Sequence, residues 1–554
     1  MNQRRIVLAV FLMFIVALLP GLLFKPKVTN RPAIGSRDST VRAPAPAAVP
    51  SRDSTVQGVV ETPRPSAALP AETVWVTSPL YRFGFTTRGA RMVAAELAQY
   101  VSFAQTDTQA LANLIPVGHP MLGSRLVLGT DTVSLSDLAF TANRQANSVT
   151  FTAPLGSGSV TLSYHFVPDD YHLSVSGKIE GLGDTGGVLL VDLGQGLRSV
   201  DAEPLADYRE FAVVTKADKT QKTTFASLDP GERAVLDGPF EWVAVKSKYF
   251  FAAVLAPEQR ARPFAGAIAV GQTRDSVAVA GLFGTRRTPL ATRAAVTTTL
   301  AVPPAGDFRY DVYVGPFEHR RLDRLGHGLD DANPYGWSIF RPIIHPVSLV
   351  VVRILFWMHE RLHLAYGWVL VIFGVLIRML LWPLQQKAME SQMRMQAVQP
   401  LMTDLQARYK SDPAKLQQEM LKLYREHKIN PLGGCLPMLL PMPVLLALFF
   451  VFSNTIEFRG VPFLWLPDLA RHDPLYIIPV VMGVSMFAVS KLGQRGLPPN
   501  PQTKMLLYFM PAMLTFVFLR LASGLNLYYA VQNLISLPQQ YLISQRRLAA
   551  QAKK

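Results

Sequence analysis

Residues 369–384 read VLVIFGVLIRMLLWPL, and Arg378 is the single charged side chain in this apolar run. With the residues just before it, the run extends over residues 364–384, and about 20 apolar residues are enough for a helix to cross the hydrocarbon core of a bilayer. The stretch therefore predicts a membrane-spanning helix, and it argues against a wholly soluble protein.

Further apolar runs lie on both sides of this helix, and residues 6–24 form one near the N-terminus. Four more spans are predicted at residues 434–452, 475–490, 505–521 and 525–543. Residues 332–363 mix apolar side chains with Arg, His, Trp337 and Trp357, as helices that lie on a membrane surface do. We therefore expect a polytopic α-helical membrane core with six spans, five of them in the C-terminal part.

The N-terminal region precedes any folded domain. Residues 1–27 are interpreted as an uncleaved signal anchor, because the small-residue A-x-A cleavage pattern is missing; a cleaved signal peptide is the alternative. Residues 28–71 are rich in Pro, Ala and Ser and contain SRDSTV twice, which predicts a flexible linker without a core of its own.

Residues 72–331 consist of short runs in which apolar and polar residues alternate, such as SVTLSYHFV at residues 159–167. A period of two predicts half-buried antiparallel strands, and a region of this length predicts one large extracytoplasmic β-sandwich. The chain has a single cysteine, Cys435, which excludes an intrachain disulfide and a multi-cysteine metal centre.

The charges indicate how the chain is oriented. Lys plus Arg number 55 against 39 Asp plus Glu, a net charge of +16. The positive residues gather in residues 385–433, 491–504 and 544–554 and beside the N-terminus, whereas residues 454–474 hold two. Because positive loops stay in the cytoplasm, both termini are expected inside and the β-domain in the periplasm. No basic stretch is interleaved with aromatic residues, so nucleic acid is a weaker interpretation.

Arg378 is the first candidate functional residue. An Arg within a span costs at least about 2.5–3.5 kcal/mol, and no other predicted span holds an acid that could neutralise it. The hypothesis is an arginine that faces a wet cavity in the inner leaflet, where it can meet a visiting anionic group. The alternative is a side chain that snorkels to the headgroups from its position near Pro383.

The last predicted span carries a polar stripe. Tyr529, Asn533, Ser536 and Gln540 are spaced by three and four residues, so they share one helical face, and Gln532 adds to the polarity. Such a stripe predicts either the lining of a groove or hydrogen bonds between helices, and both can hold together.

The cytoplasmic loop, residues 385–433, predicts a helical hairpin with helices at residues 385–409 and 411–427. Pro400 interrupts the first helix, and Ser411 or Asp412 caps the second. Its methionines are Met389, Met393, Met395, Met402 and Met420. Flexible thioethers suit a surface that captures many apolar sequences, and ordinary packing within the hairpin is the alternative for any one of them.

Residues 359–363 read HERLH and match the H-E-x-x-H pattern, in which His359 and His363 would bind zinc and Glu360 would act as general base. A membrane metalloprotease is therefore the alternative function. Against it, the motif lies at the outer side and the next carboxylate, Glu390, is predicted across the membrane. A passive transporter would show inverted repeats of broken helices, which the sequence lacks.

Several motifs together resemble one family. They are YGW at residues 335–337, IRMLLWPL at 377–384, NPLGGCLP at 430–437, DPLYIIPVVMGVSMF at 473–487 and SGLNLYYAVQNLIS at 523–536. They resemble the YidC-type membrane protein insertases of bacteria, over about residues 333–547. The resemblance also makes His359 part of an interfacial helix.

The resemblance implies a non-enzymatic insertase and chaperone of the inner membrane, without cofactors. Arg378 matches the arginine of the family's hydrophilic groove, and Gly374, Tyr528, Tyr529, Asn533 and Ser536 are the further groove residues that we expect. The implied partners are nascent integral membrane proteins, membrane lipids and the Sec translocon, with weak contacts to ribosomes and the signal-recognition-particle receptor. The sequence departs from the family at Gly374, where some relatives have Thr, and at Arg520, where relatives often have Trp.

Overall fold

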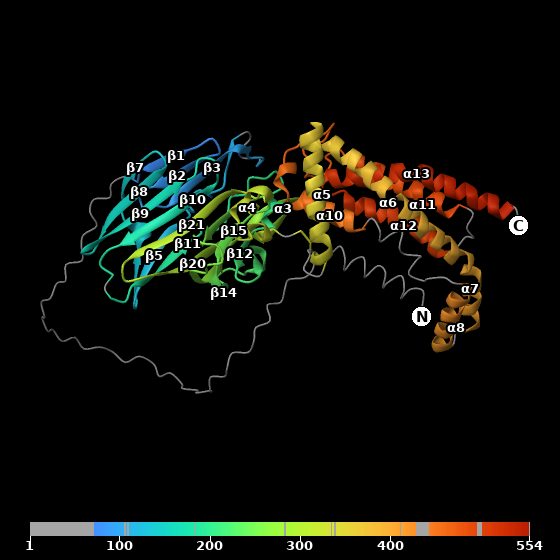
Figure 1. The fold of residues 1–554 in the computed structure, drawn as a ribbon, viewed down its shortest axis with the longest axis horizontal. Helices are drawn as coiled ribbons and strands as arrows, with labels where there is room; N and C mark the ends of the chain where they lie inside the picture. Colours follow the sequence, from blue (N-terminus) through green and yellow to red (C-terminus); the bar gives the residue numbers. More distant parts are fainter. Residues whose placement is uncertain are drawn as a thin grey trace.

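The computed structural model describes residues 71–552, apart from residues 105–106, 108–109, 183, 282–283, 334, 337–339, 410–411, 428–441 and 496–500. A β-domain and a bundle of long helices lie side by side along the molecule (Figure 1). The predicted signal anchor, the linker up to residue 70 and the NPLGGCLP motif lie outside the described residues.

The β-domain contains every strand named among the described residues, in four antiparallel sheets. The strands are β1 (Thr73–Thr77), β2 (Tyr81–Thr86), β3 (Met92–Val101), β4 (Leu111–Asn113), β5 (Gly123–Leu128), β6 (Asp131–Ser134), β7 (Thr141–Arg144), β8 (Ser148–Leu155), β9 (Gly158–Phe166), β10 (His172–Ile179), β11 (Gly187–Asp192), β12 (Ala212–Lys216), β13 (Thr220–Thr224), β14 (Arg233–Phe240), β15 (Trp242–Lys246), β16 (Phe250–Leu255), β17 (Phe264–Gly271), β18 (Arg274–Gly281), β19 (Gly284–Ala291), β20 (Ala294–Val302) and β21 (Asp307–Pro316).

Two large sheets make the sandwich. A nine-stranded sheet runs in the order β13-β12-β15-β16-β21-β10-β9-β8-β7, and a six-stranded sheet in the order β14-β17-β20-β11-β5-β6. The sheets β1-β2-β3-β4 and β18-β19 complete the domain. Trp242, Tyr164 and Tyr310 are among the largest fully buried side chains of its core. The β-sandwich predicted from the alternating sequence is confirmed.

Strand β9 shows how the sequence produces this arrangement. Val160, Leu162, Tyr164 and Phe166 alternate with more exposed residues, and each is at most 5% exposed. Since side chains alternate between the two faces of a strand, all four point into the core. Burial of each such side chain contributes roughly 1.5–3 kcal/mol, so a register shift of one residue would be strongly unfavourable.

The helical part follows the last strand. Its helices are α5 (Arg341–Leu362), α6 (Tyr366–Ala397), α7 (Gln399–Arg408), α8 (Pro413–Glu426), α10 (Met442–Asn454), α11 (Ile477–Gln494), α12 (Pro501–Phe518) and α13 (Ser523–Ala552), and two short helices, α3 (Pro204–Tyr208) and α4 (His319–Leu325), belong to the β-domain side. Among the described residues, α5, α11 and the Tyr366–Gln386 part of α6 are long and apolar enough to cross a membrane, while α10 and part of α12 are shorter apolar helices.

Helix α5 runs across the end of the bundle that faces the β-domain, at a steep angle to α6 and α13 (Figure 1). Its inward face carries Ile344, Ser348, Val351 and Leu355, which are spaced by four, three and four residues and are all buried. Trp357 on the other side is 56% exposed. The exposed side of the helix also carries Ile343 and Val350, with Arg353 between Val350 and Trp357, so its outer face is mainly apolar with one charge.

The predicted interruption of the first hairpin helix is found beside Pro400. Helix α6 continues to Ala397, and a separate helix, α7, follows and ends at Arg408. Pro400 is the second residue of α7. It has no N–H to donate to the preceding turn and its ring clashes with the carbonyl four residues earlier, so a continuous helix breaks before it, whereas the first turn of a new helix tolerates it. Asp412 caps α8, as one of the two predicted candidates, with its carboxylate accepting a 3.1 Å hydrogen bond from the Lys415 N–H.

The β-domain is fastened to the bundle through Arg459, which follows the short 3-10 helix η5 (Ile456–Phe458) after α10. Its Nε donates to Oδ1 of Asp201 over 2.5 Å, and its two Nη atoms donate to the carbonyl oxygens of Val101 and Val200 over 3.0 and 2.9 Å. The guanidinium also lies 4.4 Å from the ring centre of Phe103, and the side chain is 3% exposed. The planar fork of one arginine thus joins three groups of the β-domain.

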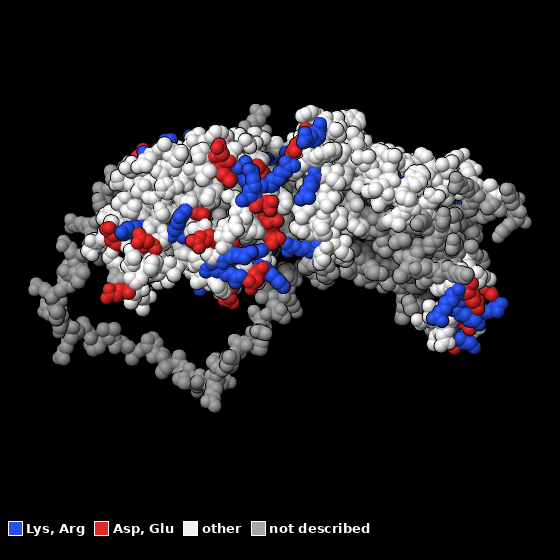
Figure 2. Space-filling view, viewed as in Figure 1, with Lys and Arg blue, Asp and Glu red and all other residues white. Residues whose placement is uncertain are grey.

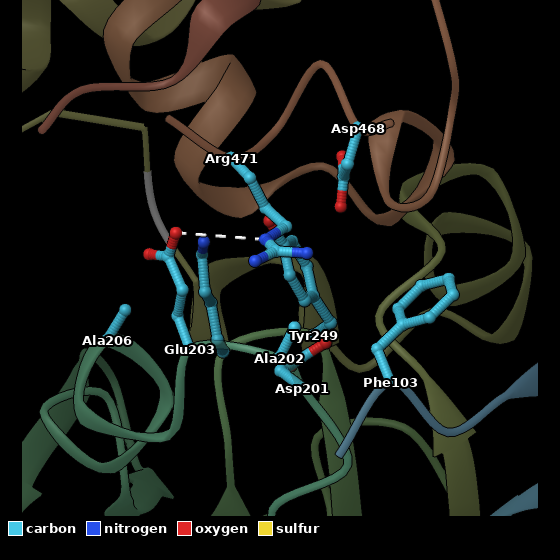
Figure 3. A pocket seen from close by; sticks show the side chains of 9 residues that line it. Phe103, Asp201, Ala202, Glu203, Ala206, Tyr249, Asp468 and Arg471 are labelled. Atoms are coloured by element: carbon cyan, nitrogen blue, oxygen red, sulfur yellow. Dashed lines mark ion pairs between the residues drawn. The ribbon is translucent and has the colours of Figure 1, made fainter. Parts of the chain in front are cut away.

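A small pocket lies beside this arginine, between the β-domain and the loop before α11 (Figure 3). Glu203 accepts a 2.5 Å bond from His472 and lies 3.7 Å from Arg471. Lys248 and Asp468 also line the pocket. The hydrogen bond and the positive charges lower the pKa of Glu203 in spite of its burial, so the carboxylate is retained at this junction.

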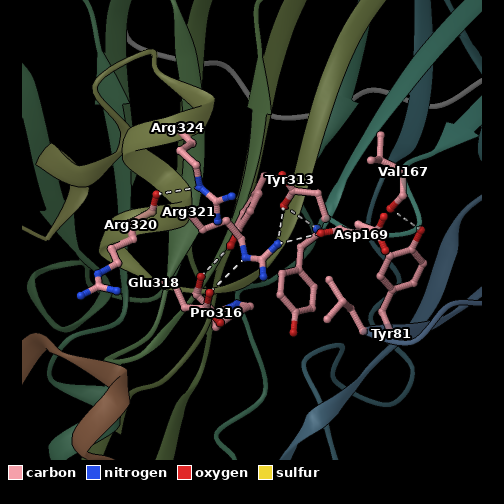
Figure 4. A network of polar contacts seen from close by, with 12 residues as sticks. Tyr81, Val167, Asp169, Tyr313, Pro316, Glu318, Arg320, Arg321 and Arg324 are labelled. Carbon is pink, nitrogen blue, oxygen red and sulfur yellow. Dashed lines mark hydrogen bonds and ion pairs between the residues drawn. The ribbon is translucent and has the colours of Figure 1, made fainter. Parts of the chain in front are cut away.

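A second polar network fixes α4, the last helix before α5 (Figure 4). Arg321 donates to Oε2 of Glu318 over 3.0 Å and to the Asp169 carbonyl oxygen over 3.0 Å. Arg320 donates to Glu360 of α5 over 2.6 Å. This network links the turn between β9 and β10 to helix α4, and the exposed Arg320–Glu360 pair links α4 to α5.

One buried acid at the junction predicts a pH dependence. Burial, with a contribution from Glu318, raises the pKa of Glu457 to about 7. Since the folded protein binds this proton more tightly than the unfolded chain does, thermal stability should fall as the pH rises from about 4.5 to 7, by at most about 1.4 kcal/mol per pH unit from this group. Glu457→Gln should stabilise the detergent-solubilised protein at pH 8 and weaken the pH dependence; exposed Glu426→Gln is the control and should do neither.

Candidate functional site

Helices α6 and α13 pack against each other (Figure 1). Arg378 belongs to α6. Its Nη2 donates a 2.7 Å hydrogen bond to Oε1 of Gln539, which is 3% exposed. The Nε atom of Arg378 is buried without a hydrogen-bond partner. The guanidinium is therefore held at one corner by a neutral amide.

The glycine one turn before Arg378 allows α13 to come close. A Cβ atom on Gly374 would lie 3.2 Å from Cγ1 of Val531, which is tighter than most such contacts. The Gly374 carbonyl oxygen accepts a 2.6 Å hydrogen bond from Nε2 of Gln532. In an α-helix the same carbonyl accepts the backbone N–H of residue 378, so Gln532 contacts the turn that carries the arginine.

Tyr528 completes this contact between the two helices. It is 2% exposed, and its ring centre lies 6.0 Å from that of Phe373 on α6. We call the set made by Gly374, Arg378, Tyr528, Gln532 and Gln539 the α6–α13 seam. Of the six groove residues predicted from the sequence, the structure brings Gly374, Arg378 and Tyr528 together here.

The other three predicted residues make their contacts elsewhere. The ring centre of Tyr529 lies 5.7 Å from that of Phe518 on α12. Nδ2 of Asn533 donates to the Met482 carbonyl oxygen on α11 over 3.4 Å, and Ser536 donates to the Asn533 carbonyl oxygen of its own helix over 2.6 Å. Tyr529 and Asn533 of the predicted polar stripe thus contact α12 and α11, whereas the neighbouring Gln532 contacts α6.

Gln539 is the residue that the sequence analysis missed. Its neighbour Gln540 completed the spacing of the stripe that begins at Tyr529, so Gln539 was not singled out. A signal was present: residues 528, 532 and 539 are separated by four and seven residues, which places them on one face of a helix of 3.6 residues per turn.

The histidines of the H-E-x-x-H motif do not converge on a common point. The ring of His359 stacks on Tyr366 with centres 3.9 Å apart, and its Nδ1 lies 2.7 Å from the Leu364 carbonyl oxygen. Glu360 pairs with Arg320, and His363 follows the end of α5 with a φ of +51°. No group of three or more potential metal ligands occurs among the residues that the structure describes. The metalloprotease alternative has no support.

Comparison with known proteins identifies the family. Residues 357–551 match the family described as 60Kd inner membrane protein, and residues 73–346 match the YidC periplasmic domain. A membrane protein insertase YidC of Burkholderia cenocepacia is 30% identical over 557 residues, which cover 97% of this chain and 94% of that protein. This chain belongs to the YidC family of membrane protein insertases.

Further relatives cover most of the chain. A YidC insertase of Burkholderia ambifaria is 30% identical over 518 residues, which are 88% of this chain and 87% of that one. A crystal structure of an active YidC insertase with the first transmembrane domain resolved shares 18% identity, covers 85% of this chain and 92% of that one, and has a TM-score of 0.34. The YidC structure from Thermotoga maritima shares 14% identity over 85% of this chain and 100% of that one, with a TM-score of 0.29.

As a YidC insertase, the chain is a multi-pass protein of the inner membrane with a periplasmic β-domain. The charges agree with this. On the face shown in Figure 2, Lys, Arg, Asp and Glu gather on the β-domain, at its junction with the bundle and on the α7–α8 hairpin, while the described surface of the bundle between them is almost entirely uncharged.

The α7–α8 hairpin carries the predicted methionine cluster in part. Met402 and Met420 are half-buried, and the Tyr424 hydroxyl lies 3.9 Å from Sδ of Met402. The side chains of Met389, Met393 and Met395 lie outside the described residues. Exposed apolar surface comes instead from Leu401 and Leu421, which are 46% and 47% exposed.

Proposed function

We propose that Arg378 is the electrostatic attractor of this YidC insertase, and that it draws the acidic outer segment of a substrate protein into the inner leaflet. The apolar span of the substrate then moves into lipid, and its burial supplies the driving force together with the membrane potential acting on acidic tails. The protein works as a non-enzymatic insertion factor, alone or with the Sec translocon.

The proposal rests on the surroundings and hydrogen bonds of the Arg378 guanidinium. Arg378 lies within the apolar run of α6, Gln539 accepts one of its hydrogen bonds, and its buried Nε is unpaired. None of the ion pairs found among the described residues includes Arg378. An arginine that keeps its full charge in a partly dry position attracts carboxylates more strongly than one in water would.

For the topology, we propose six spans. Helices α6, α10, α11, α12 and α13 form the five-span core, and residues 6–24 form the sixth span. The Lys and Arg residues of the hairpin, of residues 491–504 and of the tail support a cytoplasmic location for both termini. Helix α5 lies on the outer membrane surface, with the face of Trp357 toward lipid.

The α7–α8 hairpin is the proposed site of first substrate contact. The exposed Leu401 and Leu421 and the half-buried Met402 and Met420 supply an adaptable apolar surface. Met389, Met393 and Met395 belong to the same proposed set by their place in the sequence. Ribosomes and the signal-recognition-particle receptor would contact this hairpin and the short basic tail weakly. On the membrane side, Tyr529, Asn533 and Ser536 line the substrate path next to the seam.

An insertion assay tests the proposal. The purified protein in liposomes should insert a single-span protein with a short acidic outer tail, which is scored by protection of that tail from added protease. Arg378→Ala should lower insertion at least about tenfold, since a hydrogen bond to a charged group contributes about 1.5–3 kcal/mol and each 1.4 kcal/mol is a factor of ten. Arg378→Lys should retain most of the activity.

The same assay contains its own controls. A substrate whose tail carries Asn and Gln in place of Asp and Glu should be inserted equally well by the wild type and by Arg378→Ala. If Arg378→Ala inserts the acidic tail as efficiently as the wild type, the arginine is a snorkelling anchor and the electrostatic proposal is wrong. If the wild type gives no more protection than empty liposomes, autonomous insertion is refuted.

A further inference from the structure

We propose that Gln539 is a positioning residue for Arg378, and that its value lies in being a neutral acceptor: it fixes the guanidinium without cancelling its charge. This inference rests on the proposed role of Arg378 as the attractor of acidic segments. It identifies Gln539 as the group that keeps Arg378 in place and determines how strongly Arg378 attracts an acidic segment.

The geometry assigns the amide orientation directly. A guanidinium has only N–H donors, so the group 2.7 Å from Nη2 of Arg378 is the amide oxygen of Gln539. Gln539 is 3% exposed, so water does not compete for this contact. One of the five guanidinium donors is used in this way, and Nη donors remain for an incoming carboxylate.

The rest of the seam keeps this pair in register. Gln532, seven residues before Gln539, binds the Gly374 carbonyl oxygen over 2.6 Å. The absence of a side chain at Gly374 lets α13 lie close enough for both contacts. Two glutamines of α13 therefore form hydrogen bonds with α6: Gln532 binds the turn before Arg378, and Gln539 binds the arginine itself.

A neutral and a charged residue at position 539 would have different effects on how strongly Arg378 attracts an acidic substrate. A carboxylate at position 539 would form an ion pair with Arg378 and would leave little attraction for an acidic substrate. An apolar residue there would leave the guanidinium free to turn toward the headgroups. The charge of the partner should therefore decide how far insertion depends on the charge of the substrate tail.

The test uses the full-length protein in liposomes with paired acidic-tail and neutral-tail substrates. Gln539→Glu should lower insertion of the acidic tail about tenfold, to the level of Arg378→Ala, and should leave the neutral tail within about twofold of the wild type. Gln539→Leu should lower acidic-tail insertion several-fold. The double variant Arg378→Ala with Gln539→Leu should be no worse than Arg378→Ala, because Gln539 acts on the acidic tail only through Arg378 and both changes remove the same interaction.

Gln386→Glu is the matched control. It makes the same chemical change on an exposed position of α6, eight residues and about 12 Å along the helix from Arg378, and should change neither substrate by more than about twofold. Equal thermal unfolding of the variants shows that the fold is kept.

Three outcomes separate the hypotheses. If Arg378→Ala lowers acidic-tail insertion and both Gln539 variants do not, this inference is overturned and the role of Arg378 stands. If the Gln539 variants lower both tails equally, Gln539 has a merely structural role, which also overturns the inference. If Arg378→Ala has no effect on the acidic tail, the proposed function fails and the inference fails with it.

Discussion

Replacing Arg459 with alanine should release the β-domain from the membrane bundle. The loss should be about 3–5 kcal/mol of docking free energy, because removing one partner of a buried ion pair leaves the other charge buried and uncompensated. Asp201 would be that residue: its side chain is 11% exposed, and its second carboxylate oxygen already has no partner. The carbonyl oxygens of Val101 and Val200 would lose their donors as well.

The residue that follows Arg459 packs closely against the same aromatic ring as the Arg459 side chain. Gly460 follows with a φ of +72°, and a Cβ atom on it would lie 2.6 Å from the ring of Phe103, the ring on which the guanidinium rests. Arg459→Lys keeps the charge but cannot reach three acceptors with a planar fork, so it should recover less than half of the lost free energy.

Hydrogen exchange and limited proteolysis of the detergent-solubilised protein measure the effect. In Arg459→Ala, the backbone of residues 456–461 and 200–203 should lose protection. Arg471→Ala is the matched control, since Arg471 is 37% exposed and 3.7 Å from Glu203, and it should cost less than about 1 kcal/mol. Protection in Arg459→Ala equal to that of the wild type would show that the β-domain docks by other contacts.

The sequence predicts the architecture well where one physical signal dominates. Alternation over residues 159–167 predicts a strand because apolar side chains must share one face, and β9 occupies Gly158–Phe166. The run around Arg378 predicts a span because of its length, and α6 contains it. The continuation of α6 to Ala397 was missed, because a polar helix that leaves the membrane has no apolar period to mark its end.

Contacts between distant segments have no such signal. Arg459 and Asp201 are 258 residues apart, and nothing in either local sequence indicates that they meet. The same holds for Arg378 and Gln539, 161 residues apart. The sequence shows that an arginine within a span needs compensation, but the identity of its partner depends on how α13 is rotated against α6, and that rotation is set by packing.

Helix α11 approaches α12 so closely at Gly483 that Gly483→Ala should disrupt their packing. A Cβ atom there would lie 1.9 Å from Oγ1, 3.1 Å from Cβ and 3.3 Å from Cγ2 of Thr515. Rotation of the Thr515 side chain moves the hydroxyl away only by breaking its hydrogen bond to the Pro511 carbonyl oxygen, and Cβ of Thr515 stays at 3.1 Å whatever the rotamer. Overpacking of this kind costs about 1–3 kcal/mol, and small residues are what allow membrane helices to approach this closely.

A double-mutant cycle in thermal unfolding tests this contact. Thr515→Ala alone should cost about 0.5–1.5 kcal/mol, since its hydroxyl donates a 2.7 Å bond to the Pro511 carbonyl oxygen. In the background of Thr515→Ala, the added Gly483→Ala should cost much less than in the wild type, because Oγ1 and Cγ2 are gone and only Cβ of residue 515 remains close, at 3.1 Å. Gly493→Ala on the same helix is the control: its Cβ would meet Gln540 at an ordinary 3.6 Å, so the higher helix propensity of alanine should leave stability unchanged or raised. Additive losses in the cycle would show that Gly483 is needed for a reason other than its contact with Thr515.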